Sequence, residues 1–324
     1  MTQEFDFTNH SHRRLNLLTN KFVLCSPHRA KRPWQGAKEE IKKSALPEYD
    51  PKCYLCPGNI RATGDMNPKY DATYIFPNDY PAVRLDQPEY KEDEQDKQNT
   101  LKSRLLQTQG VRGIAPYKYL QIFENKGAAM GCSNPHPHGQ AWCLDVIPTE
   151  VKDELDNMSE YYKKYNSHLL GDYVELELQE KKRIVAENDS FIVVVPYWAL
   201  WPFETLLISK THLKSIQEFN DKQKLDLAAI LKILTTKYDN LFNTSFPYSM
   251  GIHQAPFKCT HEQNECSWFH MHFYPPLLRS ATVKKFCVGF EMLGEPQRDL
   301  TSEQAAARLQ ELNGDVHYMN KPQA

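Results

Sequence analysis

Two His-x-His pairs are the features of this chain whose residue types and spacing most directly predict chemistry. The first pair, His136 and His138, lies in the run Gly131-Cys-Ser-Asn-Pro-His-Pro-His-Gly-Gln140. Proline restricts φ and biases the preceding residue toward an extended backbone, so this run is not expected to be helical. Alternate side chains of an extended segment share a face, so His136, His138 and Gln140 are expected to point the same way. This pattern indicates a metal site, a nucleophilic histidine or one of each, rather than a loop with two solvated histidines.

A Cys-x-x-Cys pair, Cys53 and Cys56, stands directly before a Pro-Gly turn. A redox pair would be expected beside a helix in a βαβ setting, which the surrounding sequence does not indicate. We therefore interpret the pair as half of a zinc knuckle, which needs two further ligands to complete a tetrahedron. His136 is one candidate, and only one histidine of the first pair need then bind metal.

The other histidine would be a free imidazole beside Gln140. An imidazole nitrogen can attack phosphorus and form a P–N bond with high transfer potential. Phosphoryl and nucleotidyl transfer ask a protein mainly for positioning and for stabilisation of charge. Gln140 and the backbone of the proline-containing loop can provide both without a catalytic metal.

The second pair, His270 and His272, lies on the run Trp268-Phe-His-Met-His-Phe-Tyr, and His253 ends another predicted strand. A carboxylate beside these three imidazoles would complete a shell of three nitrogens and one oxygen, which suits zinc or iron. A closed shell with no position left for water predicts a structural metal. Spacing alone does not choose the carboxylate from the candidates Glu150, Asp153 and Glu154.

The elements that must position these residues are mostly short strands. Extended or buried-strand patterns are expected at 119–127, 141–147, 192–198, 204–209, 248–253 and 268–274, and at 74–84 as a strand broken by a polar turn. Gln217 to Phe242 has apolar residues near helical spacing and is the clearest predicted helix, while Glu150 to Leu170 is polar and helix-compatible. The charged run from Glu89 to Gln98 is expected to be a solvated loop or linker.

The order of these elements indicates an internal duplication, because in each half of the chain the last strand of the series is accompanied by a His-x-His pair. The later half has an amphipathic helix before its last strands, whereas none stands between Arg84 and Tyr119 in the earlier half. The symmetry therefore predicts that a helix-containing unit is missing there. We expect an α+β protein with an N-terminal half at 1–175 and a C-terminal half at 176–324.

Composition and charge exclude several classes of function. A net charge of -2 argues against a generic binder of nucleic acid or membrane surfaces, so local basic residues such as the cluster His28–Trp34 would have to bind an anionic substrate. Eight cysteines are too sparse for a disulfide scaffold. The most apolar stretch, Phe191 to Phe203, is too short to span a bilayer. The first residues show no signal-peptide pattern, and a cytoplasmic, reducing location is expected.

The chain resembles the galactose-1-phosphate uridylyltransferase family of the histidine-triad superfamily from about Phe5 to His317. The shared motifs are Ser26-Pro-His-Arg-Ala-Lys-Arg-Pro-Trp, Phe123-Glu-Asn-Lys-Gly, Gly131-Cys-Ser-Asn-Pro-His-Pro-His-Gly-Gln, Pro196-Tyr-Trp-Ala, Phe246-Pro-Tyr-Ser-Met-Gly and His272-Phe-Tyr-Pro-Pro-Leu-Leu-Arg-Ser-Ala-Thr-Val. The resemblance implies duplicated histidine-triad-like halves that form an antiparallel-rich sheet with flanking helices. It also implies a cytoplasmic homodimer of galactose metabolism that exchanges UMP between UDP-glucose and galactose 1-phosphate by a ping-pong mechanism.

The same resemblance implies roles for individual residues. His138 matches the nucleophile that becomes uridylylated, and Gln140 matches the residue that hydrogen-bonds the phosphoryl group. The positions that contact the nucleotide sugar, UDP-glucose or UDP-galactose, are Arg29, Arg32, Asn78, Asp79, Asn125 and Ser133. The positions that bind the hexose 1-phosphate are Lys285, Phe290, Glu291 and Gln297, and Gly131, Cys132, Gln140 and Phe286 are further expected substrate-binding residues. Of these, Lys285, Phe290, Glu291 and Gln297 would be reached from the partner subunit, and Phe290 lacks the hydroxyl of the tyrosine often found there. Metal ligands are Cys53, Cys56 and His136 for a first zinc, and Glu154, His253, His270 and His272 for a second site that takes zinc or iron.

The chain departs from the family between Arg112 and Lys118, near Gly113. Relatives have about forty further residues there, containing a strand with a histidine as fourth zinc ligand and then a long helix. Loss of a central strand would leave ladder groups unpaired, and a first zinc site with three ligands should bind more weakly or take water or a thiol such as Cys132. Two alternatives stay open: a non-catalytic variant that retains only metal binding, and a dinucleoside polyphosphate phosphorylase, which the C-terminal sugar-phosphate motif disfavours.

Overall fold

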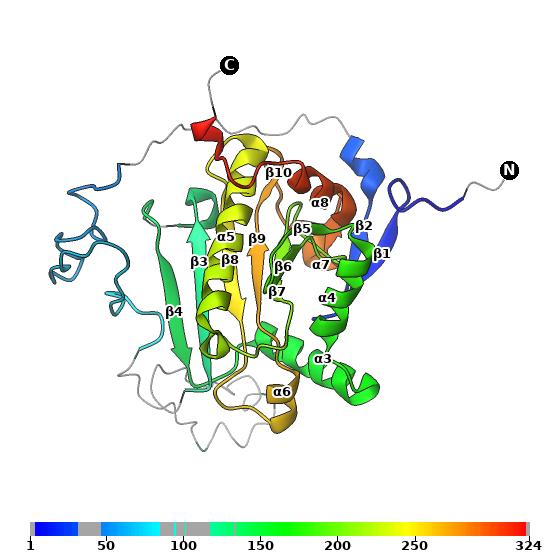
Figure 1. The fold of residues 1–324 in the computed structure, drawn as a ribbon, viewed down its shortest axis with the longest axis horizontal. Coiled ribbons are helices and arrows are strands. Elements are labelled where there is room, and N and C mark those ends of the chain that lie inside the picture. The colour runs from blue at the N-terminus through cyan, green and yellow to red at the C-terminus, as the bar shows by residue number, and fades with distance from the viewer. Residues whose placement is uncertain are drawn as a thin grey trace.

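The computed structural model describes residues 4–31, 47–84, 94, 101, 117–132 and 134–321. Their centre is a seven-stranded antiparallel sheet with helices packed on it, and a small three-stranded sheet lies at one side (Figure 1). The expected α+β class with an antiparallel-rich sheet and flanking helices is therefore confirmed. None of the helices in this described part combines the length and apolarity needed to cross a bilayer.

The strands, grouped by sheet, and the helices have the following bounds. The small sheet contains β1 (His12–Asn16), β2 (Lys21–Cys25) and β12 (Gln297–Arg298), and β10 (Leu277–Ser280) pairs with β11 (Val283–Lys284). The large sheet contains β3 (Tyr119–Lys126), β4 (Gly139–Leu144), β5 (Ile184–Glu187), β6 (Phe191–Val194), β7 (Thr205–Ser209), β8 (Tyr248–His253) and β9 (His270–Tyr274). The helices are α3 (Thr149–Tyr165), α4 (Leu169–Glu180), α5 (Asp221–Phe242), α6 (His261–Cys266), α7 (Phe290–Leu293) and α8 (Ser302–Gln310), with short 3-10 turns η1 (Pro27–Lys31), η2 (Ala128–Met130), η3 (Ile216–Glu218) and η4 (Tyr318–Asn320).

The helix predicted from Gln217 to Phe242 is confirmed as α5, with a later start. Its first residue is Asp221 because the Asn220 side chain accepts a hydrogen bond from the Gln223 amide at 2.9 Å, and the Gln223 side chain accepts from the Asn220 amide at 2.9 Å. This reciprocal capping box satisfies backbone donors at the helix N-terminus. The apolar face of α5 buries Ile230 and Leu234 completely against the large sheet.

The pairing of β3 with β8 joins the two expected halves of the chain in one sheet. The strand order is β4-β3-β8-β9-β7-β6-β5, and β3 is antiparallel to β8 from Ile122↔Ile252 to Lys126↔Tyr248. The His-x-His strand β9 pairs with β8 and β7, whereas β4 pairs only with β3 among the described strands. The outer edge of β4 therefore has no strand neighbour among the described residues. The division at residue 175, which falls within α4, stays a prediction.

The strand predicted at 74–84 is wrong, because this segment has an irregular backbone without a ladder partner. A strand needs a neighbour to satisfy its backbone groups, and β4 does not provide one. Ile75 is accordingly 93% exposed. The segment around Gly113, where the chain departs from the family, lies outside the described residues. So does the charged run 89–98, apart from residue 94.

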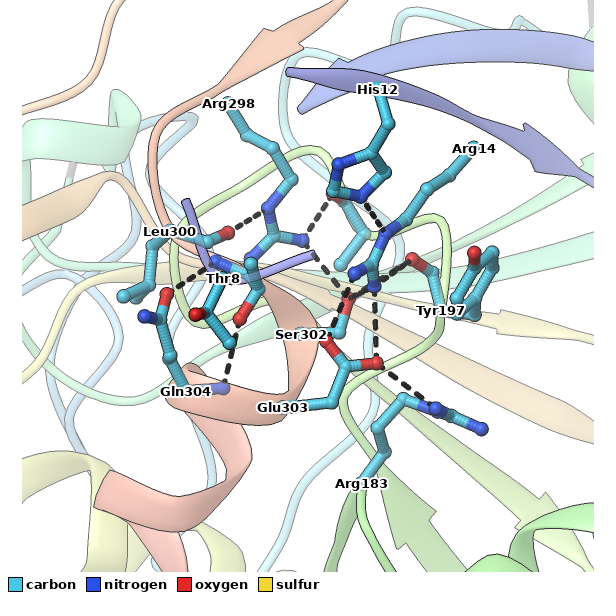
Figure 2. Close-up of polar contacts among 12 residues, drawn as sticks. Thr8, His12, Arg14, Arg183, Tyr197, Arg298, Leu300, Ser302, Glu303 and Gln304 are labelled. Carbon is cyan, nitrogen blue, oxygen red and sulfur yellow. Dashed lines mark hydrogen bonds and ion pairs between the residues drawn. The ribbon is translucent and has the colours of Figure 1, made fainter. Parts of the chain in front are cut away.

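A buried polar network fastens the small sheet to the N-terminus of α8 (Figure 2). The Arg14 guanidinium donates two hydrogen bonds to the Glu303 carboxylate, at 3.0 and 3.2 Å, and Arg183 donates a third at 3.0 Å. The Arg14 side chain is only 1% exposed, whereas that of Glu303 is 30% exposed. Glu303 therefore neutralises an arginine that water does not reach.

Glu303→Ala is expected to lower the free energy of unfolding by about 3 kcal/mol, because it leaves the Arg14 charge buried without a partner. Urea denaturation measures this loss. Glu295→Ala is the control, since Glu295 pairs with Arg13, whose side chain is 52% exposed. That pair is expected to contribute less than about 1 kcal/mol, so equal losses in the two variants would contradict the assignment.

Candidate functional site

The predicted nucleophile and the predicted phosphoryl-binding glutamine share a hollow at one edge of the large sheet. Phe123↔Gln140 and Glu124↔Gly139 are register partners of β3 and β4, so Gln140 extends from the same face as Phe123 and Asn125. The residues that line this hollow are Phe123, Asn125, Gly131, Cys132, His138, Gly139 and Gln140. The structure thus brings together five of the predicted site residues from β3, β4 and the loop between them.

Two glycines shape the backbone of this hollow. A Cβ at Gly139 would lie 3.0 Å from the carbonyl oxygen of Phe123, which is tighter than most contacts that real Cβ atoms make. The absence of a side chain therefore lets β4 approach β3 directly after His138. Gly131 ends η2 with φ of 74°, a left-handed conformation that strongly favours glycine.

The imidazole of His138 is held in one tautomer. Its Nδ1 lies 2.8 Å from the carbonyl oxygen of His136, and because a carbonyl only accepts, Nδ1 carries the proton. In the neutral ring the lone pair is then on Nε2. The geometry leaves this nitrogen as a nucleophile on a ring whose orientation the loop fixes.

The amide of Gln140 is oriented by two donors. Its Oε1 accepts from Trp142 Nε1 at 3.0 Å and from Asn78 Nδ2 at 3.4 Å. These contacts leave the Gln140 amide nitrogen to donate to an anion. Asn78, a predicted substrate-binding residue, is thereby placed next to the hollow.

Two further predicted substrate-binding residues are engaged with protein groups. Asn125 Oδ1 accepts from Ser249 Oγ at 2.6 Å, which fixes Asn125 against β8. Asp79 lies 3.5 Å from Arg61 Nη2, and its side chain is only 10% exposed. Asp79 is thus an ion-pair partner in this structure. Arg32 and Ser133, also predicted to bind substrate, lie outside the described residues.

The remaining predicted substrate-binding residues form a second group, far from His138 within one chain. Figure 1 shows β2, which leads into η1, on the opposite side of the molecule from β4. Arg29 of η1 lies 3.6 Å from Asp299, which follows β12. Lys285 Nζ donates to the Gln297 carbonyl at 2.5 Å and lies 3.3 Å from Glu291 Oε1. The aromatic members Phe286 and Phe290 are 65% and 52% exposed.

The first predicted metal site is assembled by the knuckle and the His136 loop. His136 Nδ1 lies 3.1 Å from Cys56 Sγ and 3.2 Å from Cys53 Sγ. The other ring nitrogen, Nε2, lies 3.1 Å from the Pro47 carbonyl oxygen and therefore carries the proton, which leaves Nδ1 free to coordinate. Two buried thiols and an imidazole, with donor atoms within 4.8 Å of one another, are a donor set that fits zinc.

Asn134 supports this cluster and was missed by the sequence reasoning. Its Nδ2 donates to Cys53 Sγ at 3.3 Å, and its Oδ1 accepts from the His136 amide at 2.9 Å. Burial alone would raise the pKa of the Cys53 thiol, but the hydrogen bonds from Asn134 and the Leu55 amide bring it below its ordinary value. The signal in the sequence was the position of this asparagine, two residues before His136, a predicted metal ligand.

Cys132 does not complete this cluster in the described structure. The group of donor atoms holds Cys53, Cys56 and His136, and no fourth ligand joins it among the described residues. The Cys132 thiol instead donates to the Asn134 carbonyl at 2.8 Å and lines the hollow beside His138.

The second predicted metal site is a compact group of three imidazoles around one carboxylate. Glu154 Oε2 lies 2.6 Å from His253 Nδ1 and 3.2 Å from His270 Nε2, and Oε1 lies 3.2 Å from His272 Nε2. His270 Nδ1 donates to the Trp268 carbonyl at 2.7 Å, which leaves its Nε2 unprotonated. His272 Nε2 is buried and makes no hydrogen bond with the described residues. A metal ion would satisfy this atom, so the three nitrogens and one oxygen fit zinc or iron.

The electrostatics of this group agree with a metal-binding role. Burial opposes ionisation of Glu154, but the imidazoles of His253 and His272 hold the pKa of its carboxyl well below the usual range. Burial lowers the pKa of His272 to about 4, so its ring is neutral at pH 7. A carboxylate and neutral imidazoles are the protonation states that coordinate metal.

The structure selects Glu154 from the three carboxylates that spacing left open. Glu154 lies on the buried face of α3 with Val151, Leu155 and Met158, whereas Glu150 is exposed. The helical spacing of these apolar residues was the signal that sequence reasoning did not use.

Comparisons with known proteins agree with the fold. A family model described as galactose-1-phosphate uridyl transferase, N-terminal domain, matches residues 3–116 and 107–148, and the corresponding C-terminal domain model matches 154–322. The galactose-1-phosphate uridylyltransferase of Schizosaccharomyces pombe is 66% identical over 98% of this chain and 99% of its own length. That alignment spans 365 positions, more than the 324 residues of this chain. The N-terminal family model matches in two separate stretches, 3–116 and 107–148, which meet near Gly113. The predicted missing segment near Gly113 is therefore confirmed.

Solved structures with the same fold cover nearly the whole chain. A uridylyltransferase structure superposes with a TM-score of 0.65 at 27% identity, over 93% of this chain and 98% of that one. An ADP-glucose phosphorylase from Arabidopsis thaliana has a TM-score of 0.67 over 94% and 100%, but at 21% identity it shows the fold alone. Fold and site define this chain as one of the uridylyltransferase-like proteins. More specifically, it belongs to the galactose-1-phosphate uridylyltransferase family.

Glu154→Ala is expected to remove the metal of the second site, because it takes away the one oxygen donor among the described residues of this group and the charge that its three imidazoles face. Metal content by plasma mass spectrometry should fall by about one ion per chain, with a lower thermal midpoint. Glu150→Ala, an exposed change on the same helix, should retain all metal. Unchanged metal content in the Glu154 variant would rule out this ligand set.

Proposed function

We propose that this chain exchanges UMP between UDP-glucose and galactose 1-phosphate by a ping-pong mechanism, with the UMP carried on His138, as an enzyme of galactose metabolism in the cytoplasm. The observation that carries this proposal is the fixed tautomer of His138, whose Nδ1 donates to the His136 carbonyl at 2.8 Å in a hollow shared with Gln140. The identity of relatives such as the Schizosaccharomyces pombe protein supports the choice of substrates.

In the first half-reaction, His138 Nε2 attacks the α-phosphorus of UDP-glucose. A P–N bond forms, the bond from that phosphorus to the bridging oxygen breaks, and glucose 1-phosphate leaves. The ring becomes positively charged, and the His136 carbonyl stabilises it through Nδ1–H. The Gln140 amide nitrogen donates to a phosphoryl oxygen, where negative charge accumulates. In the second half-reaction, a phosphate oxygen of galactose 1-phosphate attacks the same phosphorus and releases His138.

Both metal-binding groups have structural roles in this proposal. A zinc ion held by Cys53, Cys56 and His136 would stiffen the loop whose His136 carbonyl orients His138. A zinc or iron ion held by the second group would join α3 to β8 and β9. Neither group lines the hollow that holds His138.

We further propose that the enzyme is a homodimer in which each copy completes the partner's site. Arg29, Lys285 and Gln297 lie on the other side of the chain from His138, yet all match substrate-binding positions of the family. Exposed Phe286 and Phe290 are suited to contact a second copy. The group would bind the sugar phosphate at the partner's hollow.

The alternative, a non-catalytic variant that retains only metal binding, has two observations in its favour. In the part of the chain that the structure describes, β4 lacks a second neighbour and the first metal group lacks a fourth ligand. A chain with normal turnover and one cooperative thermal transition would exclude this alternative.

His138→Asn is expected to abolish transfer, because an amide nitrogen has no lone pair for attack on phosphorus. The purified protein is mixed with UDP-glucose labelled in its α-phosphate, without acceptor, and acid-labile label on the protein is measured. Wild-type protein and the control His261→Asn, a change in α6 outside the hollow, should both retain label. Turnover of the His138 variant should fall by at least about 10³-fold. Wild-type protein without bound label would refute the proposed mechanism.

A further inference from the structure

Asp299 connects two predicted substrate-binding residues that lie at opposite ends of the sequence. Its Oδ1 accepts a hydrogen bond from Gln297 Nε2 at 2.6 Å and lies 3.6 Å from Arg29 Nε. The Asp299 side chain is 21% exposed and the Gln297 residue is 8% exposed, so water reaches their contact only in part, whereas the Arg29 side chain is 49% exposed. Asp299 is not one of the residues that the sequence singled out.

The backbone around Asp299 is fixed by the buried neighbour Arg298. β12 runs parallel to β2, with Gln297 opposite Leu24 and Arg298 opposite Cys25, so the segment that carries Asp299 lies beside the one that leads to Arg29. Arg298 is 2% exposed and donates to the Leu300 and Ala199 carbonyls and to Ser302 Oγ (Figure 2). Adjacent side chains of an extended segment point to opposite sides, so anchoring Arg298 in the interior directs Gln297 and Asp299 toward Arg29.

The contact with Asp299 engages the Arg29 side chain at Nε only. Among the described residues no partner binds the Arg29 Nη1 and Nη2 atoms, which form the part of the guanidinium fork that can bind two phosphate oxygens. Lys285 lies close by, since its Nζ donates to the Gln297 carbonyl at 2.5 Å. Asp299 thus contacts an arginine whose phosphate-binding edge has no partner among the described residues, and Lys285 contacts the backbone of the other Asp299 partner, Gln297.

A carboxylate in this position would by itself weaken the binding of a phosphate, because like charges repel. Its contacts with Arg29 and Gln297 offset that repulsion if they hold both side chains ready for the ligand. Long side chains such as arginine lose rotamer freedom on binding, and a prior contact reduces that loss.

We propose that Asp299 is a positioning residue of the sugar-phosphate subsite, where it holds Arg29 and Gln297 so that they meet the phosphate of the hexose 1-phosphate as one unit. This inference rests on the proposed function, because it takes Arg29 and Gln297 as substrate-binding. It assigns Asp299 no contact with the reacting phosphorus.

The test compares Asp299→Asn and Asp299→Ala with Glu295→Gln in the full-length protein. Asp299→Asn removes the charge but keeps an oxygen for Gln297, so it separates positioning from repulsion. Both Asp299 variants are expected to raise the KM for galactose 1-phosphate about three- to tenfold, with kcat changed less than about twofold. Glu295→Gln alters a carboxylate that pairs with Arg13, just before β12, and should leave both constants unchanged. In an Arg29→Ala background, Asp299→Asn should add less than about a twofold further increase in KM, because the side chain it positions is absent.

The outcomes separate the two proposals. An Asp299→Asn variant with an unchanged or lower KM would overturn the positioning role, since removal of repulsion alone lowers KM. If Asp299→Ala does not fold, the Asp299→Asn variant decides, provided that its thermal midpoint matches the wild type. Wild-type protein without transferase activity would refute the proposed function, and this inference with it, whereas active wild type with unaffected variants refutes the inference alone.

Discussion

The antiparallel ladder between β3 and β8 is the constraint on which the candidate site depends. β3 provides Phe123 and Asn125 to the hollow, and β4, which begins directly after His138, pairs with the rest of the described sheet only through β3. The same β8 ends at His253, a ligand of the second metal-binding group. One strand pair therefore fixes the distance between His138 and the second metal-binding group, and disruption of that ladder would affect both.

The two metal-binding groups differ in how much of their environment the chain provides. Glu154, His270 and His272 are buried, and the Trp268 carbonyl sets the tautomer of His270, so the described residues provide the second group with four ligands. The first group has three donors and rests on an irregular segment, supported mainly by Asn134 and backbone contacts. Affinity for metal follows ligand number and the rigidity of the supporting contacts, which favours the second group.

Features set by local sequence were predicted correctly, and features set by distant partners were not. The alternation of His270 and His272 along a strand and the apolar spacing of α5 depend on a few neighbouring residues, and the structure confirms both. The segment at 74–84 has strand-like composition, but a strand also requires a paired neighbour, which no local pattern reveals. Asp299 escaped notice for a similar reason, because its partner Arg29 lies at the other end of the sequence. Asn134 and Glu154 could have been found from the sequence. Asn134 lies two residues before His136, and Glu154 lies on the same helical face as Val151, Leu155 and Met158.

The separation of β3 from β8 along the chain also affects synthesis on the ribosome. Ile122 pairs with Ile252, so the hairpin of β3 and β4 leaves the ribosome long before its main partner strand. An isolated two-stranded hairpin is at best marginally stable in water. At about 5–20 residues per second, the nascent hairpin waits roughly 5–20 s for β8. During this interval Trp142 and Phe123, whose rings lie 5.3 Å apart in the folded protein, are open to molecular chaperones and to other nascent chains.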